Sequence, residues 1–131
     1  MKEKIIYCAD AIAFYADKIV IVERLGSVRG LALPGGKQDD GENLTDTIVR
    51  ELREETGLTF VPEIVFGTYA EPNRDPRGNY VSTVFVGKAT GEIKDEPGKT
   101  KVILLDRDSF QDRKSEFMFD HWQILESYFA R

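Results

Sequence analysis

The sequence contains only one cysteine, one histidine and one tryptophan in 131 residues. A single cysteine cannot form a disulfide within the chain, and Cys8 lies in an apolar segment, so we expect it to be buried and unreactive. His121 and Trp122 are neighbours in a pattern of apolar residues at helical spacing. We interpret both as packing residues, rather than as a catalytic base and a platform for stacking a nucleobase.

Long hydrophobic runs are also absent. No stretch is apolar over the roughly 20 residues that a membrane helix requires. The first 14 residues lack the pattern of a cleaved signal peptide. These absences favour a cytoplasmic protein with no membrane partner. The sequence has no internal repeat, low-complexity tract or linker, so residues 1–131 are expected to form a single domain.

Positive charge is in deficit, with 18 Lys and Arg against 23 Asp and Glu and a formal net charge of −5. Nonspecific binding to nucleic acid depends on clustered basic residues that neutralise phosphates. The composition therefore argues against a nucleic-acid partner. A small phosphorylated substrate remains compatible with it, because bound metal ions can supply positive charge locally.

The most informative segment is residues 36–58, GKQDDGENLTDTIVRELREETGL. Asn43 is a favourable N-cap, and Asp46 stands where a capping box places an acid. Gly57 is the residue type that commonly ends helices. These signals predict a helix over residues 44–56.

One face of this predicted helix is acidic. At about 100° per residue, Glu51, Glu54 and Glu55 fall on the same side. An adjacent apolar stripe would dock the helix on a sheet; it comprises Ile48, Val49 and Leu52. Such a helix face is usually a solvated row of Glu and Arg pairs. Crowded carboxylates can instead hold a hard cation, because their oxygens are the ligands that Mg²⁺ and Mn²⁺ prefer.

The fixed residues of the segment decide between these two interpretations. They follow the pattern G-x5-E-x7-R-E-L-x-E-E-x-G-L, which begins at Gly36 and ends at Leu58. This pattern resembles a complete Nudix box. The resemblance implies a metal-dependent enzyme that uses Mg²⁺, with Mn²⁺ as a possible substitute.

The resemblance also implies a role for each position of the box. The main-chain carbonyl of Gly35 and the carboxylates of Glu51 and Glu55 would bind the metal directly. Glu54 would bind metal or orient the attacking water. A further pair, Glu42 and Arg50, would brace the loop before the helix against the helix itself.

The remaining elements follow from hydrophobic periodicity. Alternating or β-rich runs predict strands at residues 5–15, 18–23, 60–70, 80–89 and 101–105. Apolar residues at helical spacing predict a closing amphipathic helix over residues 115–130. This order suits an α/β fold, an α/β/α sandwich around a mixed sheet, which is also the Nudix fold.

Two polar loops carry arginines that could meet phosphates. Arg24 and Arg29 belong to the first, residues 24–31, and Arg74 and Arg77 belong to the second, EPNRDPRGN. Surface arginines on rigid turns are the alternative interpretation. The segment NRDPRG followed by VSTVF resembles the DPRG segment of small ADP-ribose pyrophosphatases within the Nudix family. That resemblance favours substrate binding by the second loop.

The resemblance further implies an acid in residues 90–100, where some family members carry a general base or an additional metal ligand. Glu96 is the candidate here, with Glu92 as the alternative. Whether Glu54 or an acid of this link deprotonates the water stays open, because a general base is decided by geometry before pKa.

Taken together, the expected reaction is Mg²⁺-dependent hydrolysis of a nucleoside diphosphate linked to another group. The expected substrate is ADP-ribose, which would give AMP and ribose 5-phosphate. Two alternatives are a pyrophosphohydrolase of nucleoside triphosphates and a nucleotide-sensing module without activity. The intact box carboxylates favour turnover over sensing. A homodimer is a further expectation from the resemblance.

Overall fold

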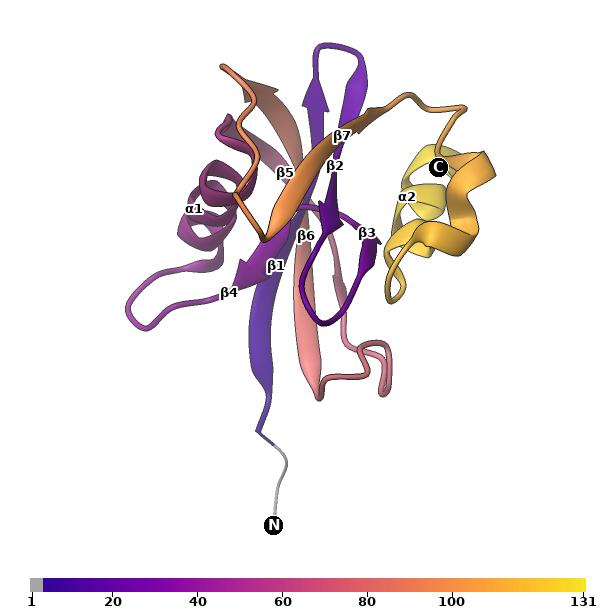
Figure 1. Ribbon diagram of the computed structural model, residues 1–131. Coiled ribbons are helices and arrows are strands. Elements are labelled where there is room, and N and C mark those ends of the chain that lie inside the picture. The colour runs from indigo at the N-terminus through magenta and orange to yellow at the C-terminus, as the bar shows by residue number, and fades with distance from the viewer. Residues whose placement is uncertain (1–3) are drawn as a thin grey trace.

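The computed structural model describes residues 4–131, which form three layers: a sheet lies between helix α1 on one side and helix α2 on the other (Figure 1). The strands are β1 (Ile6–Tyr15), β2 (Lys18–Arg24), β3 (Gly30–Ala32), β4 (Gly35–Lys37), β5 (Thr59–Tyr69), β6 (Tyr80–Thr90) and β7 (Thr100–Leu105). The helices are α1 (Leu44–Thr56), the 3₁₀ segment η1 (Gln111–Glu116) and α2 (His121–Ala130). The predicted α/β/α sandwich is therefore confirmed.

The sheet is mixed, as predicted. Its order is β3-β2-β1-β6-β5, with β4 paired to β1 and β7 paired to β2. The two central strands, β1 and β6, run parallel, whereas the other pairs are antiparallel. The short strand β4 pairs with Cys8, Ala9 and Asp10 of β1, so the start of the box is held against a central strand of the sheet.

Strand β1 shows how one sequence serves both faces of the sheet. Side chains alternate between faces along a strand. Ala9, Ala11 and Ala13 therefore pack in the cluster that contains Ile48 and Leu52 of α1. The intervening residues pack against α2, and include Ile12 and Phe14. Val49 is 36% exposed, so the apolar stripe of α1 is narrower than predicted.

Helix α1 has the predicted bounds because its ends are fixed by local contacts. The Asn43 side chain accepts a hydrogen bond from the main-chain N–H of Asp46 at 2.8 Å, and the Asp46 carboxylate accepts one from Asn43 N–H at 3.4 Å. Gly57 ends the helix in the left-handed region, with φ at 77°, and donates to the Arg53 carbonyl. Both caps use residues within four positions of the helix.

The predicted helix over residues 115–130 is wrong in its first third, since α2 begins only at His121. Phe119 has a left-handed φ of 55°, which interrupts any helix. The Met118 N–H donates to the Leu31 carbonyl at 2.8 Å, and Phe117 bridges to the same residue. This stretch therefore extends the edge of the sheet beside β3, one of two short strands that periodicity did not reveal.

Burial bears out the packing roles predicted for the rare residues. Cys8, His121 and Trp122 are 8%, 3% and 7% exposed. Burial raises the pKa of the Cys8 thiol to about 12, which keeps it protonated. No helix of residues 4–131 is both long and apolar enough to cross a membrane. The first three residues of the N-terminal segment lie outside the described part of the chain.

Candidate active site

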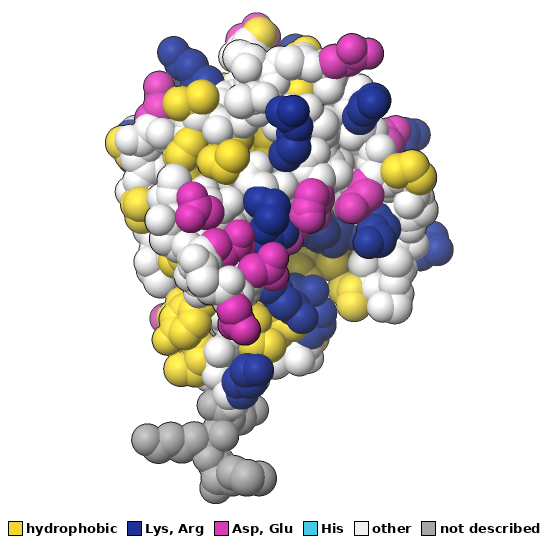
Figure 2. All heavy atoms as spheres, turned by 90° about the vertical axis from the view of Figure 1, so that its left-hand side faces the viewer, with side chains coloured by type: hydrophobic (Ala, Val, Ile, Leu, Met, Phe, Trp, Pro, Cys, Tyr) yellow, Lys and Arg dark blue, Asp and Glu magenta, His cyan; other side chains and the backbone are white. Residues whose placement is uncertain are grey.

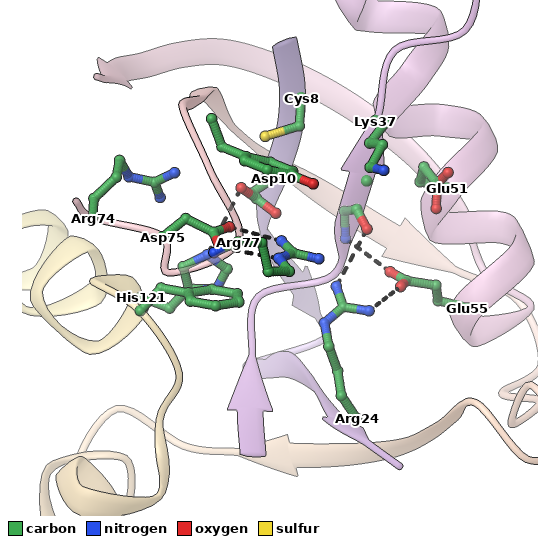
Figure 3. A pocket seen from close by; sticks show the side chains of 14 residues that line it. Cys8, Asp10, Arg24, Lys37, Glu51, Glu55, Arg74, Asp75, Arg77 and His121 are labelled. Carbon is green, nitrogen blue, oxygen red and sulfur yellow. Dashed lines mark hydrogen bonds and ion pairs between the residues drawn. The ribbon is translucent and has the colours of Figure 1, made fainter. Parts of the chain in front are cut away.

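A cavity of about 210 Å³ lies where β1, β4 and α1 meet the 71–79 loop and the start of α2 (Figure 3). Its two ends differ in chemistry. The glutamate end is formed by Gly35, Gly36, Glu51 and Glu55. The Asp10 end is formed by Cys8, Asp10, Arg74, Asp75, Arg77, Tyr80, Phe119 and His121. Arg24 and Lys37 complete the lining.

The glutamate end depends on two consecutive glycines. A Cβ on Gly35 would collide with the Ala9 carbonyl and with Asp10, because β4 pairs directly with β1 at this point. A Cβ on Gly36 would collide with the carboxyl group of Glu51. The absence of both side chains leaves a cradle in which main chain and carboxylates approach one another closely.

Glu55 is the buried acid of this end, with a side chain only 5% exposed. One carboxylate oxygen accepts the Gly35 N–H at 2.8 Å, and the other accepts Nη1 of Arg24 at 2.8 Å. Nη2 of Arg24 also donates to the Gly35 carbonyl at 3.3 Å. Desolvation raises the pKa of Glu55 to about 7, against the opposing effects of Arg24 and the Gly35 N–H.

These contacts bear on whether a metal ion fits the site. The Gly35 carbonyl and the Glu55 carboxylate already converge on one positive group, the Arg24 guanidinium. An oxygen-only donor set of this kind suits Mg²⁺ or Mn²⁺. The side chains of residues 4–131 do not by themselves form a cluster of three metal-binding groups. A metal site at this end would therefore need the Gly35 carbonyl beside the carboxylates.

Arg50 organises the exposed side of the same end. It contacts Glu42 at 2.7 Å, Glu51 at 2.7 Å and Glu54 at 3.0 Å. The predicted pair of Glu42 and Arg50 is thus present, and its hydrogen bonds lower the pKa of Glu42 to about 2. Burial raises the pKa of Glu51, and the hydrogen bond and charge of Arg50 offset only part of this rise. One guanidinium shared among several carboxylates leaves excess negative charge for a cation to neutralise.

The ion pairs of Arg50 belong to a wider band of mixed charge. On the face that carries α1, acidic and basic side chains gather across the middle of the molecule, with hydrophobic side chains above and below them (Figure 2). Arg50 also pairs with Asp39, whose carboxylate lies 3.3 Å from its guanidinium. The glutamate end of the cavity therefore opens onto a charged surface and not onto an apolar one.

The sequence was then compared with known proteins. A model of the NUDIX domain matches residues 7–127. This chain belongs to the Nudix family. A protein named ADP-ribose pyrophosphatase from Methanocaldococcus jannaschii is 34% identical to it over 122 residues, which cover 91% of this chain and 70% of that protein. The predicted membership of the Nudix family is confirmed, and with it the prediction that the chain is a Nudix pyrophosphohydrolase.

Solved structures agree with the Nudix assignment. A NUDIX hydrolase from Nitrosomonas europaea superposes with a TM-score of 0.83 at 25% identity, covering 97% of this chain and 90% of that one. A bifunctional NMN adenylyltransferase/ADP ribose pyrophosphatase from Francisella tularensis, complexed with AMP and a Mn ion, superposes with a TM-score of 0.88 at 22% identity. The present chain covers 42% of that larger protein, with 98% of its own length.

The Nudix box residues predicted from the sequence lie together, but only three of the four predicted arginines line the cavity beside them. Arg24 reaches the glutamate end, as described above. Arg29 is exposed and does not line the cavity. Arg74 lines it with a side chain only 4% exposed, held by two hydrogen bonds to Asp120 at 2.6 and 2.8 Å. Arg77 lines it while paired with Asp75 at 2.7 Å.

The predicted acid of the 90–100 link lies beside the cavity instead of in it. Glu96 is partly exposed and lines an adjoining groove of about 350 Å³. This groove shares Arg24, Glu55 and Arg77 with the cavity, so the two spaces lie on either side of the same three side chains. Glu54 is 46% exposed and stands outside the cavity lining, on the same helix as Glu55.

Sequence reasoning predicted Arg74 and Arg77 of the Asp10 end but gave no role in a site to Asp10, to its partner Ser82 or to His121. Asp10, Ser82 and His121 come from β1, β6 and the first turn of α2. The Ser82 hydroxyl donates to the Asp10 carboxylate, and Nε2 of His121 lies 3.8 Å from the same oxygen. A signal was available, because an aspartate inside the apolar strand IYCADAIAFY is unusual in a buried position.

The raised pKa of Glu55 predicts how metal affinity depends on pH. The ligand must be deprotonated, so affinity for Mn²⁺ should rise by up to about tenfold per pH unit and level off above pH about 7. Isothermal titration calorimetry across this range measures it. The folded protein retains a proton that the unfolded chain loses near its ordinary pKa of 4.5. This contribution to the metal-free protein's free energy of unfolding is therefore full below pH 4.5 and lost as pH rises through about 7.

Proposed function

We propose that this Nudix protein hydrolyses the diphosphate of ADP-ribose, releasing AMP and ribose 5-phosphate, with Mg²⁺ as its metal. One observation carries the proposal: the Gly35 carbonyl and the Glu55 carboxylate converge on the Arg24 guanidinium, in a cavity that is also lined by Arg77 of the DPRG segment. The relative from Methanocaldococcus jannaschii, named ADP-ribose pyrophosphatase, supports the choice of substrate.

The residues that would hold the metal are Gly35, Glu51 and Glu55, with Glu54 at the exposed edge. A divalent ion bound there supplies acidity to a coordinated water and neutralises charge on the leaving phosphate. Arg24 contributes a guanidinium beside the same oxygens, where it can meet a phosphate oxygen of the diphosphate. Glu54 is the better candidate for orienting water, because its half-exposed carboxylate is open to solvent. Glu96 remains the alternative from the adjoining groove.

The proposal is tested by measuring release of AMP and ribose 5-phosphate from ADP-ribose with Mg²⁺. Parallel reactions should contain nucleotide sugars, dinucleoside polyphosphates and nucleoside triphosphates. We expect selective cleavage of ADP-ribose. A strong preference for triphosphates would instead favour the alternative pyrophosphohydrolase, and tight binding of ADP-ribose without AMP release would favour the sensing module.

Arg77 provides a more local test of substrate binding. Its side chain is 43% exposed and is oriented by Asp75 and by the ring of Tyr80, whose centroid lies 4.6 Å from the guanidinium carbon. Arg77→Ala should raise KM for ADP-ribose by roughly tenfold, because a charge-assisted contact with phosphate is lost. Steady-state kinetics measure this change.

Two controls accompany the Arg77 variant. Arg77→Lys keeps the charge but not the planar fork, so an intermediate KM is expected. Arg113→Ala removes a surface arginine paired only with Glu116 and should leave the kinetics unchanged. An Arg77→Ala enzyme with wild-type KM would reduce the loop to a scaffold.

A further inference from the structure

Asp10 carries a nearly buried carboxylate whose use the metal chemistry does not explain. Its side chain is only 8% exposed. One oxygen, Oδ2, accepts the Ser82 hydroxyl and faces Nε2 of His121. Nδ1 of His121 accepts the Leu33 N–H at 2.9 Å, so the ring's own proton lies on Nε2, toward Asp10. Burial lowers the pKa of His121, which keeps the ring neutral.

The second oxygen, Oδ1, lies against Gly35 of the paired strand β4, on the position that a Cβ at Gly35 would occupy. Within residues 4–131, no side-chain or loop donor makes a hydrogen bond to it. No side-chain oxygen or nitrogen of the described residues is both fully buried and without a partner, so Oδ1 retains access to the cavity that Asp10 lines. Figure 3 shows the Asp10 side chain between β1 and the side chains of Asp75 and Arg77. A ligand group that enters beside Asp10 therefore meets this acceptor together with the half-exposed Arg77 guanidinium.

The two arginines of this end, Arg74 and Arg77, are each paired with a carboxylate other than Asp10. Arg74 makes both of its hydrogen bonds to Asp120. Arg77 makes two side-chain hydrogen bonds to Asp75, at 3.0 and 2.7 Å. Neither arginine is paired with Asp10, so a phosphate placed directly against Asp10 would meet the charge of its carboxylate, and like charges in a largely dehydrated space repel strongly. Arg77, which is 43% exposed, remains available to the diphosphate itself.

The aromatic faces of this end are also occupied. The Arg77 guanidinium lies 4.6 Å from the centroid of Tyr80 and 4.9 Å from that of Phe119. A nucleobase needs a free aromatic face on which to stack. A compact neutral group with hydroxyl donors needs only the open acceptor. The adjoining groove is larger and carries apolar side chains, Val28 and Met118, that suit a base.

We propose that Asp10 is a specificity-determining residue that accepts a hydrogen bond from a hydroxyl of the terminal ribose of ADP-ribose. This inference rests on the proposed function and adds the position of the terminal sugar. Ser82 acts as the positioning residue, because its hydroxyl donates to Oδ2 and leaves Oδ1 for the sugar, and the neutral His121 ring packs 3.8 Å from the same oxygen. The nucleoside half occupies the adjoining groove, on the other side of the diphosphate.

The test compares two substrates in wild-type and Asp10→Asn protein: ADP-ribose, and the methyl ester of ADP, which keeps the nucleoside and diphosphate but lacks the terminal sugar. Asparagine has the size of aspartate without its charge. We expect kcat/KM for ADP-ribose to fall roughly tenfold, because a hydrogen bond to a charged acceptor becomes a neutral one. The kcat/KM for the methyl ester and the affinity for AMP should remain unchanged.

If Asp10 had a purely structural role, Asp10→Asn would lower kcat/KM equally for ADP-ribose and for the methyl ester, and that result would overturn the assignment. An unchanged kcat/KM for ADP-ribose would also overturn it. Asp10→Glu guards against a folding defect, because it keeps the charge but extends the carboxylate into the cavity. It should also impair ADP-ribose selectively, and Asp106→Asn, on the surface, should impair neither substrate. If wild-type protein releases no AMP from ADP-ribose, the proposed function fails and this inference fails with it.

Discussion

Glu55→Gln should reduce turnover of ADP-ribose by roughly 100-fold or more while the protein remains folded. Loss of an outer partner alone lowers affinity or activity at metal sites by roughly 10–100-fold, and Glu55 is proposed to be a direct ligand. The amide oxygen of glutamine can still accept the Gly35 N–H, but its uncharged end no longer pairs with Arg24 or with a metal. Affinity for Mn²⁺ by calorimetry should fall together with kcat.

The same variant should also lose the part of the pH dependence of metal binding that Glu55 contributes near pH 7, while Glu51, whose pKa is also raised by burial, keeps its own contribution. Glu63→Gln is a matched control, because Glu63 is an exposed glutamate on β5, away from the cavity lining. It should leave kcat, metal affinity and melting temperature unchanged. Turnover by Glu55→Gln within a few-fold of wild type would refute the proposed ligand set.

Gly35→Ala is expected to have the second largest effect, on stability as well as activity. The added methyl group would collide with the Ala9 carbonyl and with the backbone and side chain of Asp10. Backbone atoms cannot move aside as a flexible side chain can, so β4 must shift away from β1. Overpacking of this kind destabilises by about 1–3 kcal/mol. The shift also carries the Gly35 carbonyl away from Glu55, which should lower kcat by roughly 100-fold.

Chemical denaturation and steady-state kinetics measure these two effects separately. Gly67→Ala is the control, because a Cβ at Gly67 meets only the Tyr69 side chain, at an ordinary contact distance of 3.5 Å, and Gly67 does not line the cavity or the adjoining groove. That variant should match the wild type in both measurements. A Gly35→Ala protein with normal stability and normal turnover would mean that β4 tolerates displacement, and the carbonyl would then lose its proposed role.

Helix α1 and the box could be predicted because their information is local. The caps join residues within four positions of the helix, and the brace between Glu42 and Arg50 spans only eight positions along the chain. Contacts of this range depend on little besides the helix itself. The first third of the closing helix was predicted wrongly for the opposite reason. Its apolar spacing is helical, but Met118 forms a hydrogen bond with Leu31, a residue from the opposite end of the sequence.

The roles of the arginines could not be settled in the same way. Arg74 and Arg77 are three positions apart in one loop, and the sequence predicts phosphate binding equally for both. The fold brings Asp120, 46 positions away, against Arg74 and buries that pair. Arg77 keeps a local partner, Asp75, and remains 43% exposed beside the cavity. Only the tertiary contact separates a buried brace from a group available to substrate.

The sequence by itself determined the family and the bounds of helix α1, and it placed Glu51, Glu54 and Glu55 together, because spacing along one helix fixes which side chains share a face. The tertiary structure alone decided which other groups join them. Parallel pairing of β1 with β6 brings Asp10 to Ser82, and the start of α2 adds His121. Such convergence depends on pairing between distant strands, which no local pattern encodes.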